Sequence, residues 1–178
     1  MDNKVIIEAA LAKICQRAIA LGATDAQPLK ASSVVVKDWV RLKCQFGCGG
    51  YGEGLTCPPY SPTPDTTRKV ISGYEWTVVL KFEKSGSDGW KKTHDVIADL
   101  EREVFLDGFH AAYGYSCGPC PYCKTCNLKH CVHPRKARPS MEGSGIDVYS
   151  TVRAAGFDIH VLKTESEEPT YFCILLVQ

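Results

Sequence analysis

The stretch from Cys117 to Cys131 constrains this chain more than any other part of the sequence. It holds five of the ten cysteines, and four of these five follow one another at three-residue spacing. Thiolates this close together repel one another, and disulfides between such near neighbours are strained. A metal centre neutralises the charge and requires several converging sulfurs, so the run predicts metal binding.

The spacing within the run favours an iron–sulfur cluster. The segment Cys120-x2-Cys123-x2-Cys126 reproduces the three-cysteine core of bacterial ferredoxin motifs, and Cys131 follows after four further residues. Such spacing lets successive sulfurs wrap one face of a cubane. We therefore predict that these four cysteines hold a [4Fe–4S] cluster.

Two other chemistries remain open for the same run. A closed zinc site is the first, because the four cysteines form two pairs with His130 and His133 nearby. Thiol redox chemistry at Cys117-Gly-Pro-Cys120 is the second. Pro121 and three further thiols disfavour an isolated dithiol, and the separated ligand pairs of structural zinc sites are missing.

A second group consists of Cys44, Cys48 and Cys57 within residues 44–62. Five glycines and three prolines make this segment a predicted loop rather than a helix or strand. Three cysteines alone are a weak signal. The prediction of a metal site here becomes stronger because the other run contains one cysteine more than a single cubane requires.

The number of cysteines suggests a second cluster. One cubane takes four cysteines, so Cys117 is free to complete the set of the first loop. Only Cys15 and Cys173 then remain, and both lie on apolar faces where a free cysteine is usually buried. We therefore predict two [4Fe–4S] clusters, with Cys44, Cys48, Cys57 and Cys117 as one ligand set and Cys120, Cys123, Cys126 and Cys131 as the other.

The role of Cys117 separates two functions. Two fully ligated clusters indicate low-potential electron transfer to a redox partner protein in anaerobic metabolism. If Cys117 does not ligate, the first-loop cluster keeps an open iron that acts as a Lewis acid on a small-molecule substrate. Whether the chain is an enzyme therefore stays open. Glu53, Tyr60 and Glu142 are the nearby candidate proton donors.

Composition narrows the remaining possibilities. The 21 basic and 20 acidic residues nearly balance, so we expect no nucleic-acid partner. No apolar run is long enough to span a bilayer, and the first residues show no signal-peptide pattern, so we expect a cytoplasmic protein with no membrane association. In a reducing cytosol, ten cysteines favour metal ligation over disulfides. The basic Arg135, Lys136 and Arg138 either form a solvated face or dock an acidic partner or anionic substrate.

Periodicity predicts one domain over residues 1–178, an α/β (α+β) sandwich with a mixed sheet of four to five strands. Two cysteine-rich loops, at residues 44–62 and 117–139, are inserted at strand ends. Helices are expected at residues 3–21, 64–72, 90–107 and 147–155, and strands at residues 33–40, 74–82, 109–115, 157–162 and 171–177. The strand–helix–strand order over residues 74–115 predicts a parallel pair with a right-handed crossover.

Two blocks of this sequence resemble an uncharacterised family of predicted metal-binding proteins, a domain of unknown function from anaerobic bacteria and archaea. The first is Cys44-x3-Cys48-Gly-Gly-Tyr-Gly-x3-Thr-Cys-Pro-Pro. The second runs from Cys120 through Cys131-x-His-Pro-x-Lys-Ala-Arg-Pro-Ser-Met-Glu and continues to Gly-Ile-Asp-Val148. The resemblance implies metal binding and iron–sulfur clusters, supplies no reaction, and does not cover Cys117.

Overall fold

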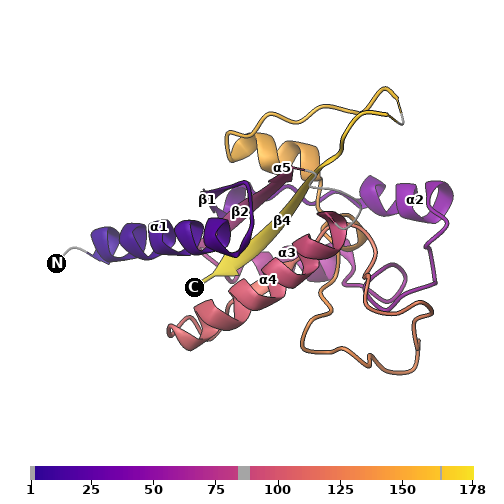
Figure 1. Cartoon of the computed structure of the whole chain (residues 1–178), viewed down its shortest axis with the longest axis horizontal. Helices are drawn as coiled ribbons and strands as arrows, with labels where there is room; N and C mark the ends of the chain where they lie inside the picture. Colours follow the sequence, from indigo (N-terminus) through magenta and orange to yellow (C-terminus); the bar gives the residue numbers. More distant parts are fainter. Residues whose placement is uncertain (1–2, 84–88, 165) are drawn as a thin grey trace.

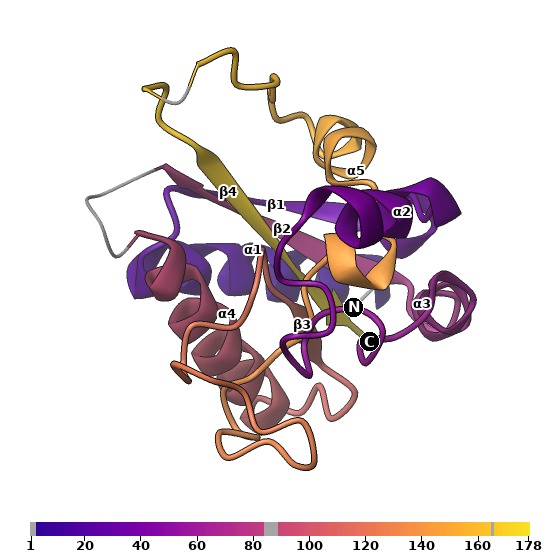
Figure 2. The same ribbon diagram turned by 90° about the vertical axis from the view of Figure 1, so that its right-hand side faces the viewer.

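A four-stranded sheet with helices on both faces forms the framework of the protein (Figures 1 and 2). The computed structural model describes residues 3–83, 89–164 and 166–178. The strand order is β1-β2-β4-β3, and each neighbouring pair is antiparallel. The strands are β1 (Asp25–Lys30), β2 (Trp76–Glu83), β3 (Tyr113–Tyr115) and β4 (Thr170–Val177), and the helices are α1 (Asn3–Leu21), α2 (Asp38–Gly47), α3 (Pro64–Ile71), α4 (Gly89–Leu106) and α5 (Val148–Ala154).

Strand β4 lies in the middle of the sheet and is buried on both faces. It pairs with β2 along its whole length and with β3 over residues 174–176. Cys173, Leu175 and Val177 face one core, while Phe172 and Ile174 face the other. Its uninterrupted apolar sequence is explained by this position, because both sets of alternating side chains are removed from water.

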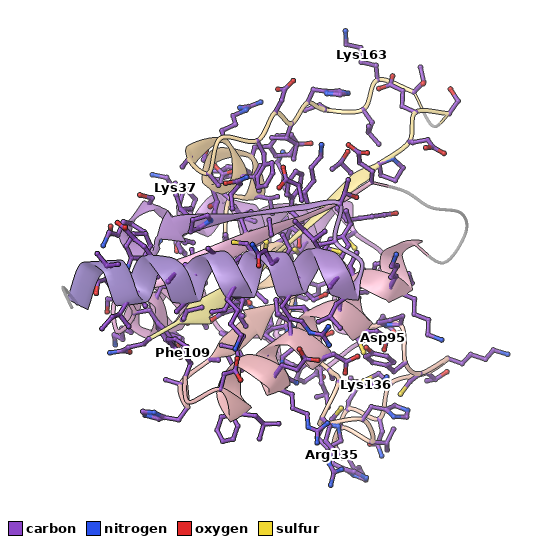
Figure 3. All side chains as sticks on the ribbon, turned by 60° about the vertical axis from the view of Figure 1, so that its left-hand side comes forward. Lys37, Asp95, Phe109, Arg135, Lys136 and Lys163 are labelled. Atoms are coloured by element: carbon purple, nitrogen blue, oxygen red, sulfur yellow. The ribbon has the colours of Figure 1, made fainter. Side chains whose placement is uncertain are left out.

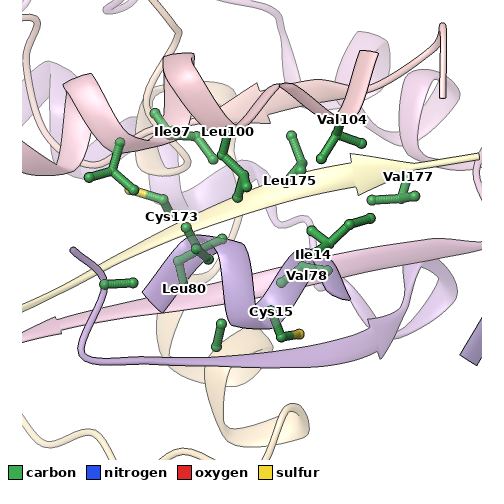
Figure 4. Close-up of a cluster of buried hydrophobic side chains, with 14 of the residues drawn as sticks. Ile14, Cys15, Val78, Leu80, Ile97, Leu100, Val104, Cys173, Leu175 and Val177 are labelled. Atoms are coloured by element: carbon green, nitrogen blue, oxygen red, sulfur yellow. The ribbon is translucent and has the colours of Figure 1, made fainter. Parts of the chain in front are cut away.

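Helices α1 and α4 cover one face of the sheet (Figure 4). Their inward residues recur at helical spacing, as with Leu11, Ile14 and Ala18 on α1 and Ile97 and Leu100 on α4. Each fully buried leucine or isoleucine stabilises the fold by about 1.5–3 kcal/mol. The predicted helices at residues 3–21 and 90–107 are confirmed, although the turn expected before the second one falls mostly on residues 84–88, outside the described part of the chain.

The other face is covered by α3, α5 and the chain around residues 141–146. Helix α3 begins where the Thr63 hydroxyl accepts a hydrogen bond from Thr66 N at 3.2 Å. Helix α5 begins where the Asp147 carboxylate accepts one from Ser150 N, also at 3.2 Å. Both predicted helices are confirmed. Each begins after a short polar N-cap residue that accepts an otherwise unpaired backbone N–H.

Two predicted strands are wrong. Residues 33–40 contain the end of a 3₁₀ helix (Ala31–Ser33), an extended piece bridged only at Val36 and the first turn of α2, because the helix begins at Asp38. Residues 157–162 are irregular, with Phe157 buried and Val161 exposed. The apolar side chains that alternate in these two segments do not lie together on one buried face.

Other boundaries also differ from expectation. Strand β1 was not predicted, the strand at residues 109–115 is formed only from Tyr113 to Tyr115, and Cys44 lies on α2 rather than in a loop. Strands β2 and β3 run parallel as predicted but do not pair, because β4 lies between them. The α+β sandwich is confirmed, with antiparallel rather than mixed pairing. None of the helices in the described residues is both long and apolar enough to cross a bilayer.

The cysteine at position 15 provides a test of this core. Burial raises the pKa of the Cys15 thiol from 9.0 to about 11, with a further contribution from the negative charge of Asp25. At pH 8 the folded protein therefore holds roughly a hundredfold less thiolate at this position than an exposed cysteine. We expect alkylation by iodoacetamide, followed by peptide mass spectrometry, to be at least that much slower in the native protein than in urea. Equal rates in the two conditions would contradict this packing.

Candidate metal centre

The second cysteine loop (residues 117–139) is closed at its base. Ser116, directly after β3, donates its N–H to Pro139 O at 2.9 Å, and Met141 N donates to Ser116 O at 2.8 Å. The chain thus leaves and re-enters the core at one point. Because its ends are joined, the loop is anchored although it forms no helix or strand within residues 117–139.

A buried ion pair connects this loop to α4. The Arg138 guanidinium donates to both carboxylate oxygens of Glu101, each at 2.6 Å, and the two side chains are 13% and 14% exposed. Glu101 also accepts the N–H of Gly114 in β3 at 2.7 Å. One carboxylate therefore ties helix, strand and loop together, and bidentate geometry fixes the direction of Arg138.

A second contact lies nearer the start of α4. Asp95 accepts hydrogen bonds from Tyr122 Oη at 3.0 Å and from Lys136 Nζ at 2.8 Å (Figure 3). Burial raises the pKa of Asp95, but these two hydrogen bonds and the positive charges of Lys136 and Lys91 outweigh it and hold the pKa below its usual value. Of the basic run, Lys136 and Arg138 thus contact acids of α4, whereas Arg135 is exposed.

A third contact fixes the start of the loop. His94, fully buried on α4, has its Nε2 2.9 Å from Cys117 O. Burial lowers the pKa of His94 to about 4, so the ring is neutral at pH 7 and Nε2 carries the donated proton. The imidazole here positions the backbone of Cys117.

The thiol of Cys117 points into the core. It lies 3.1 Å from Thr93 Oγ1 and beside Cys173, whose pKa is raised first by burial and then by Cys117. Cys117 is 5% exposed and belongs to the core cluster under α1 and α4. Cys15 and Cys173 are buried there as predicted.

The remaining cysteines of the second loop surround a cavity of about 190 Å³, here called the sulfur cavity. Residues of the first cysteine loop (44–62), including Glu53 and Cys57, form its other wall. The five cysteines that line it are Cys57, Cys120, Cys123, Cys126 and Cys131. The two loops, far apart in sequence, therefore lie against each other, as Figures 1 and 2 also show.

The cysteines of the first loop line a second cavity, of about 430 Å³, here called the apolar cavity. Cys44 reaches it from the last turn of α2, while Cys48 and Cys57 follow in irregular chain. Cys117 also belongs to its lining. The thiol of Cys48 accepts the N–H of Gly50 at 3.4 Å, and such an N–H···S contact would raise the potential of a redox metal bound to this sulfur.

The thiols of both loops interact electrostatically. Burial raises the pKa of Cys57, and the neighbouring thiolates of Cys44, Cys48 and Cys120 raise it further, while the nearby Thr56 hydroxyl acts in the opposite direction. Burial likewise raises the pKa of Cys120, followed by Cys131, Cys123 and Cys126. Positive charge brought by a metal would relieve this repulsion, so binding should release protons.

Of the three candidate proton donors, only Glu142 lies in the apolar cavity. Its carboxyl is next to Cys44, and burial raises its pKa despite the N–H groups of Glu142 and Gly118 nearby. Glu53 is exposed at the sulfur cavity, and Tyr60 is exposed and lines neither cavity.

The cysteines surround cavities rather than a single point. Within residues 3–83, 89–164 and 166–178, no three histidine, cysteine, aspartate or glutamate side chains are close enough to hold one metal ion. An isolated zinc ion requires sulfurs about 3.8 Å apart, as follows from a Zn–S distance of about 2.3 Å in a tetrahedron. The arrangement is that of two cysteine-lined hollows sharing Cys57.

An α+β framework that presents thiols around such hollows belongs to the class of cysteine-rich metal-binding proteins. Residues 27–177 match the family described as "Predicted metal-binding protein (DUF2284)", and the chain therefore belongs to that family. The family predicted from the two sequence blocks is confirmed. No curated protein and no solved structure matches this chain.

Sequence reasoning missed the residues that hold the site in place. His94, Asp95 and Glu101 look like ordinary members of an amphipathic helix, and their partners lie about 20 to 40 residues away. The one sequence pattern that could have indicated their role is the presence of three polar residues on or beside the inward face of α4. The apolar walls of the larger cavity, such as Trp39 and Tyr171, gave no signal because they come from separate elements.

The ion pair of Glu101 and Arg138 predicts a measurable loss of stability. In Glu101→Gln the guanidinium stays buried without its carboxylate, which should lower the free energy of unfolding by about 3 kcal/mol. Glu103→Gln, on the same helix, breaks the half-exposed pair with Arg17 and should cost less than about 1 kcal/mol. Urea unfolding followed by circular dichroism measures both. Similar losses in the two variants would rule out the anchoring role.

The buried His94 predicts a pH dependence. Because its folded-state pKa of about 4 lies below the usual 6.5, the unfolded chain binds a proton in this interval that the folded chain does not. Stability is therefore complete above pH 6.5 and falls towards pH 4, by at most about 3 kcal/mol. His94→Gln keeps an N–H donor for Cys117 O and does not titrate. If urea unfolding at pH 7 and pH 5 gives wild type and variant the same change, His94 does not contribute.

Proposed function

We propose that this protein is an iron–sulfur protein that carries two [4Fe–4S] clusters and transfers low-potential electrons to a partner protein. The supporting observation is the division of the cysteines between two cavities. Cys120, Cys123, Cys126 and Cys131 line the smaller one, whereas Cys44, Cys48 and Cys117 line the larger one, with Cys57 in both.

The donor set fits clusters better than isolated ions. Every cysteine of the two loops lines one of the two hollows, so the thiols are spread around a hollow, as the separate irons of a cubane require. A zinc-stabilised binding module, the alternative, would bring three or four of these donors to one point. When bound, the clusters supply one-electron redox chemistry; the chain supplies burial, anchoring and N–H···S contacts such as that of Gly50.

The sharing of Cys57 supports electron transfer between the two sites. It lines both cavities, and the negative charges of Cys44 in its own loop and of Cys120 in the other loop raise the pKa of its thiol. Clusters held by these two sets would lie next to each other. Short separation favours rapid electron exchange between them.

A second candidate function follows from the position of Cys117. Its thiol is hydrogen-bonded to Thr93 and packed beside Cys173, and it would have to leave these contacts to join Cys44, Cys48 and Cys57. Without it, the first-loop cluster would have three cysteine ligands and an open position for a small molecule. This enzyme hypothesis shares the iron–sulfur chemistry and differs in one ligand.

Metal analysis tests the proposal. After anaerobic purification we expect about eight irons and eight sulfides per chain, with a broad visible absorption near 400 nm that bleaches on reduction, as two cubanes require. Cys131→Ser should lose the cluster of the second loop, whereas Cys15→Ser, a buried thiol outside both cavities, should lose neither. A colourless protein that carries zinc would refute the iron–sulfur assignment.

Cys117→Ser distinguishes the two candidate functions. If Cys117 is a ligand, the variant should lose the first-loop cluster or convert it to a species with a changed electron paramagnetic resonance spectrum. If the thiol stays in the core, iron content and spectrum should match the wild type. The second result favours the open-site enzyme.

A further inference from the structure

The apolar cavity is large enough for more than a cluster edge. Its volume of about 430 Å³ falls within the range of about 300–1,000 Å³ typical of small-molecule sites. One part of its wall carries the cysteines of the first loop. The rest includes five aromatic residues from four separate parts of the fold, Trp39, Tyr51, Tyr149, Tyr171 and Phe172.

Several polar side chains around this cavity already have partners within the protein. Asp147 caps α5, accepting hydrogen bonds from the Ser150 N–H and hydroxyl at 3.2 and 2.6 Å. The hydroxyl of Ser140 accepts the N–H of Gly143 at 2.9 Å. Lys43 lies with its Nζ 5.2 Å from the centroid of the Trp39 ring. Asp147 and Ser140 are thus already engaged in hydrogen bonds within the protein.

Glu142 differs from them. The backbone N–H groups of Glu142 and Gly118 lie near its carboxyl, but its Oε2 is buried and has no hydrogen-bond partner among the described residues. The backbone around it is tightly held, because a Cβ added at the next residue, Gly143, would lie 2.7 Å from Ser140 Oγ. An unmet buried carboxyl oxygen costs about 1–3 kcal/mol, and this fold retains one at the wall of an aromatic cavity.

We propose that the apolar cavity binds a small, flat, largely apolar molecule through its aromatic walls, and that a hydroxyl or amine of this molecule donates a hydrogen bond to Glu142. The apolar body is matched to the aromatic rings, and the single donor satisfies the oxygen that the protein leaves unpaired. The bound molecule lies against the thiols of Cys44, Cys48 and Cys57. This binding goes beyond electron transfer and does not require a particular metal at those thiols.

Two related compounds test the proposal, 2-naphthol and its methyl ether, which has the same ring system but no donor. Equilibrium dialysis against the protein as purified anaerobically should show 2-naphthol binding at least about fivefold more tightly than the ether. In Glu142→Met, of similar length and without the carboxyl, this preference should fall to about one. Glu75→Met, which removes an exposed carboxylate paired with Lys30, should keep it.

A second variant locates the binding independently of Glu142. Tyr149→Ala removes an aromatic wall and should weaken both compounds by about fivefold or more while leaving their ratio unchanged. Iron and sulfide are measured in every sample, so that loss of a cluster is distinguished from loss of ligand binding. The proposal is overturned if neither compound binds below about 1 mM, if both bind equally to the wild type, if the preference survives in Glu142→Met, or if Tyr149→Ala changes neither affinity.

Discussion

The cysteine site depends most on the hydrogen bonds that the Glu101 carboxylate accepts. It receives Arg138 from the end of the second loop and the Gly114 N–H from β3, and it stands on a helix packed against the central sheet. Together with His94 and Asp95 it makes one face of α4 the platform of the loop. The second cysteine loop contains no helix or strand, and these contacts give it a defined path because they are all made with one rigid helix, α4.

The chain from Ser140 to Asp147 has the corresponding role for the first loop. Ser140 donates its N–H to Thr56 O at 3.4 Å, and the Ser61 hydroxyl donates to Gly143 O at 2.7 Å. The same segment pairs with Ser116 at the base of the second loop. It is therefore the common wall between the two loops. The close packing at Gly143, rather than turn flexibility, explains the glycine there.

The sequence was sufficient to predict elements whose patterns are local. Helix α4 and strand β4 carry strong periodic signals, and the cysteine spacing, which is also a local pattern, indicated the metal-binding family. Strand β1 could not be found in this way, because Pro28 and its alternation of half-exposed residues become a strand only by pairing with β2. Helix α2 was missed because the three valines before it favour a strand. The contacts that hold the site in place join residues distant in sequence, which a single sequence does not reveal.

The position of β4 in the chain order has a consequence for synthesis. Within the described sheet, β3 pairs only with β4, and β2 has β4 as its partner on the side facing the second loop. Both cysteine loops are therefore translated before the strand that completes the sheet beneath them. Until residues 170–177 leave the ribosome, the thiols are presented on an unfinished scaffold. Metal can therefore reach the native site only after this strand has been translated, and the nascent thiols are exposed to oxidation during the interval.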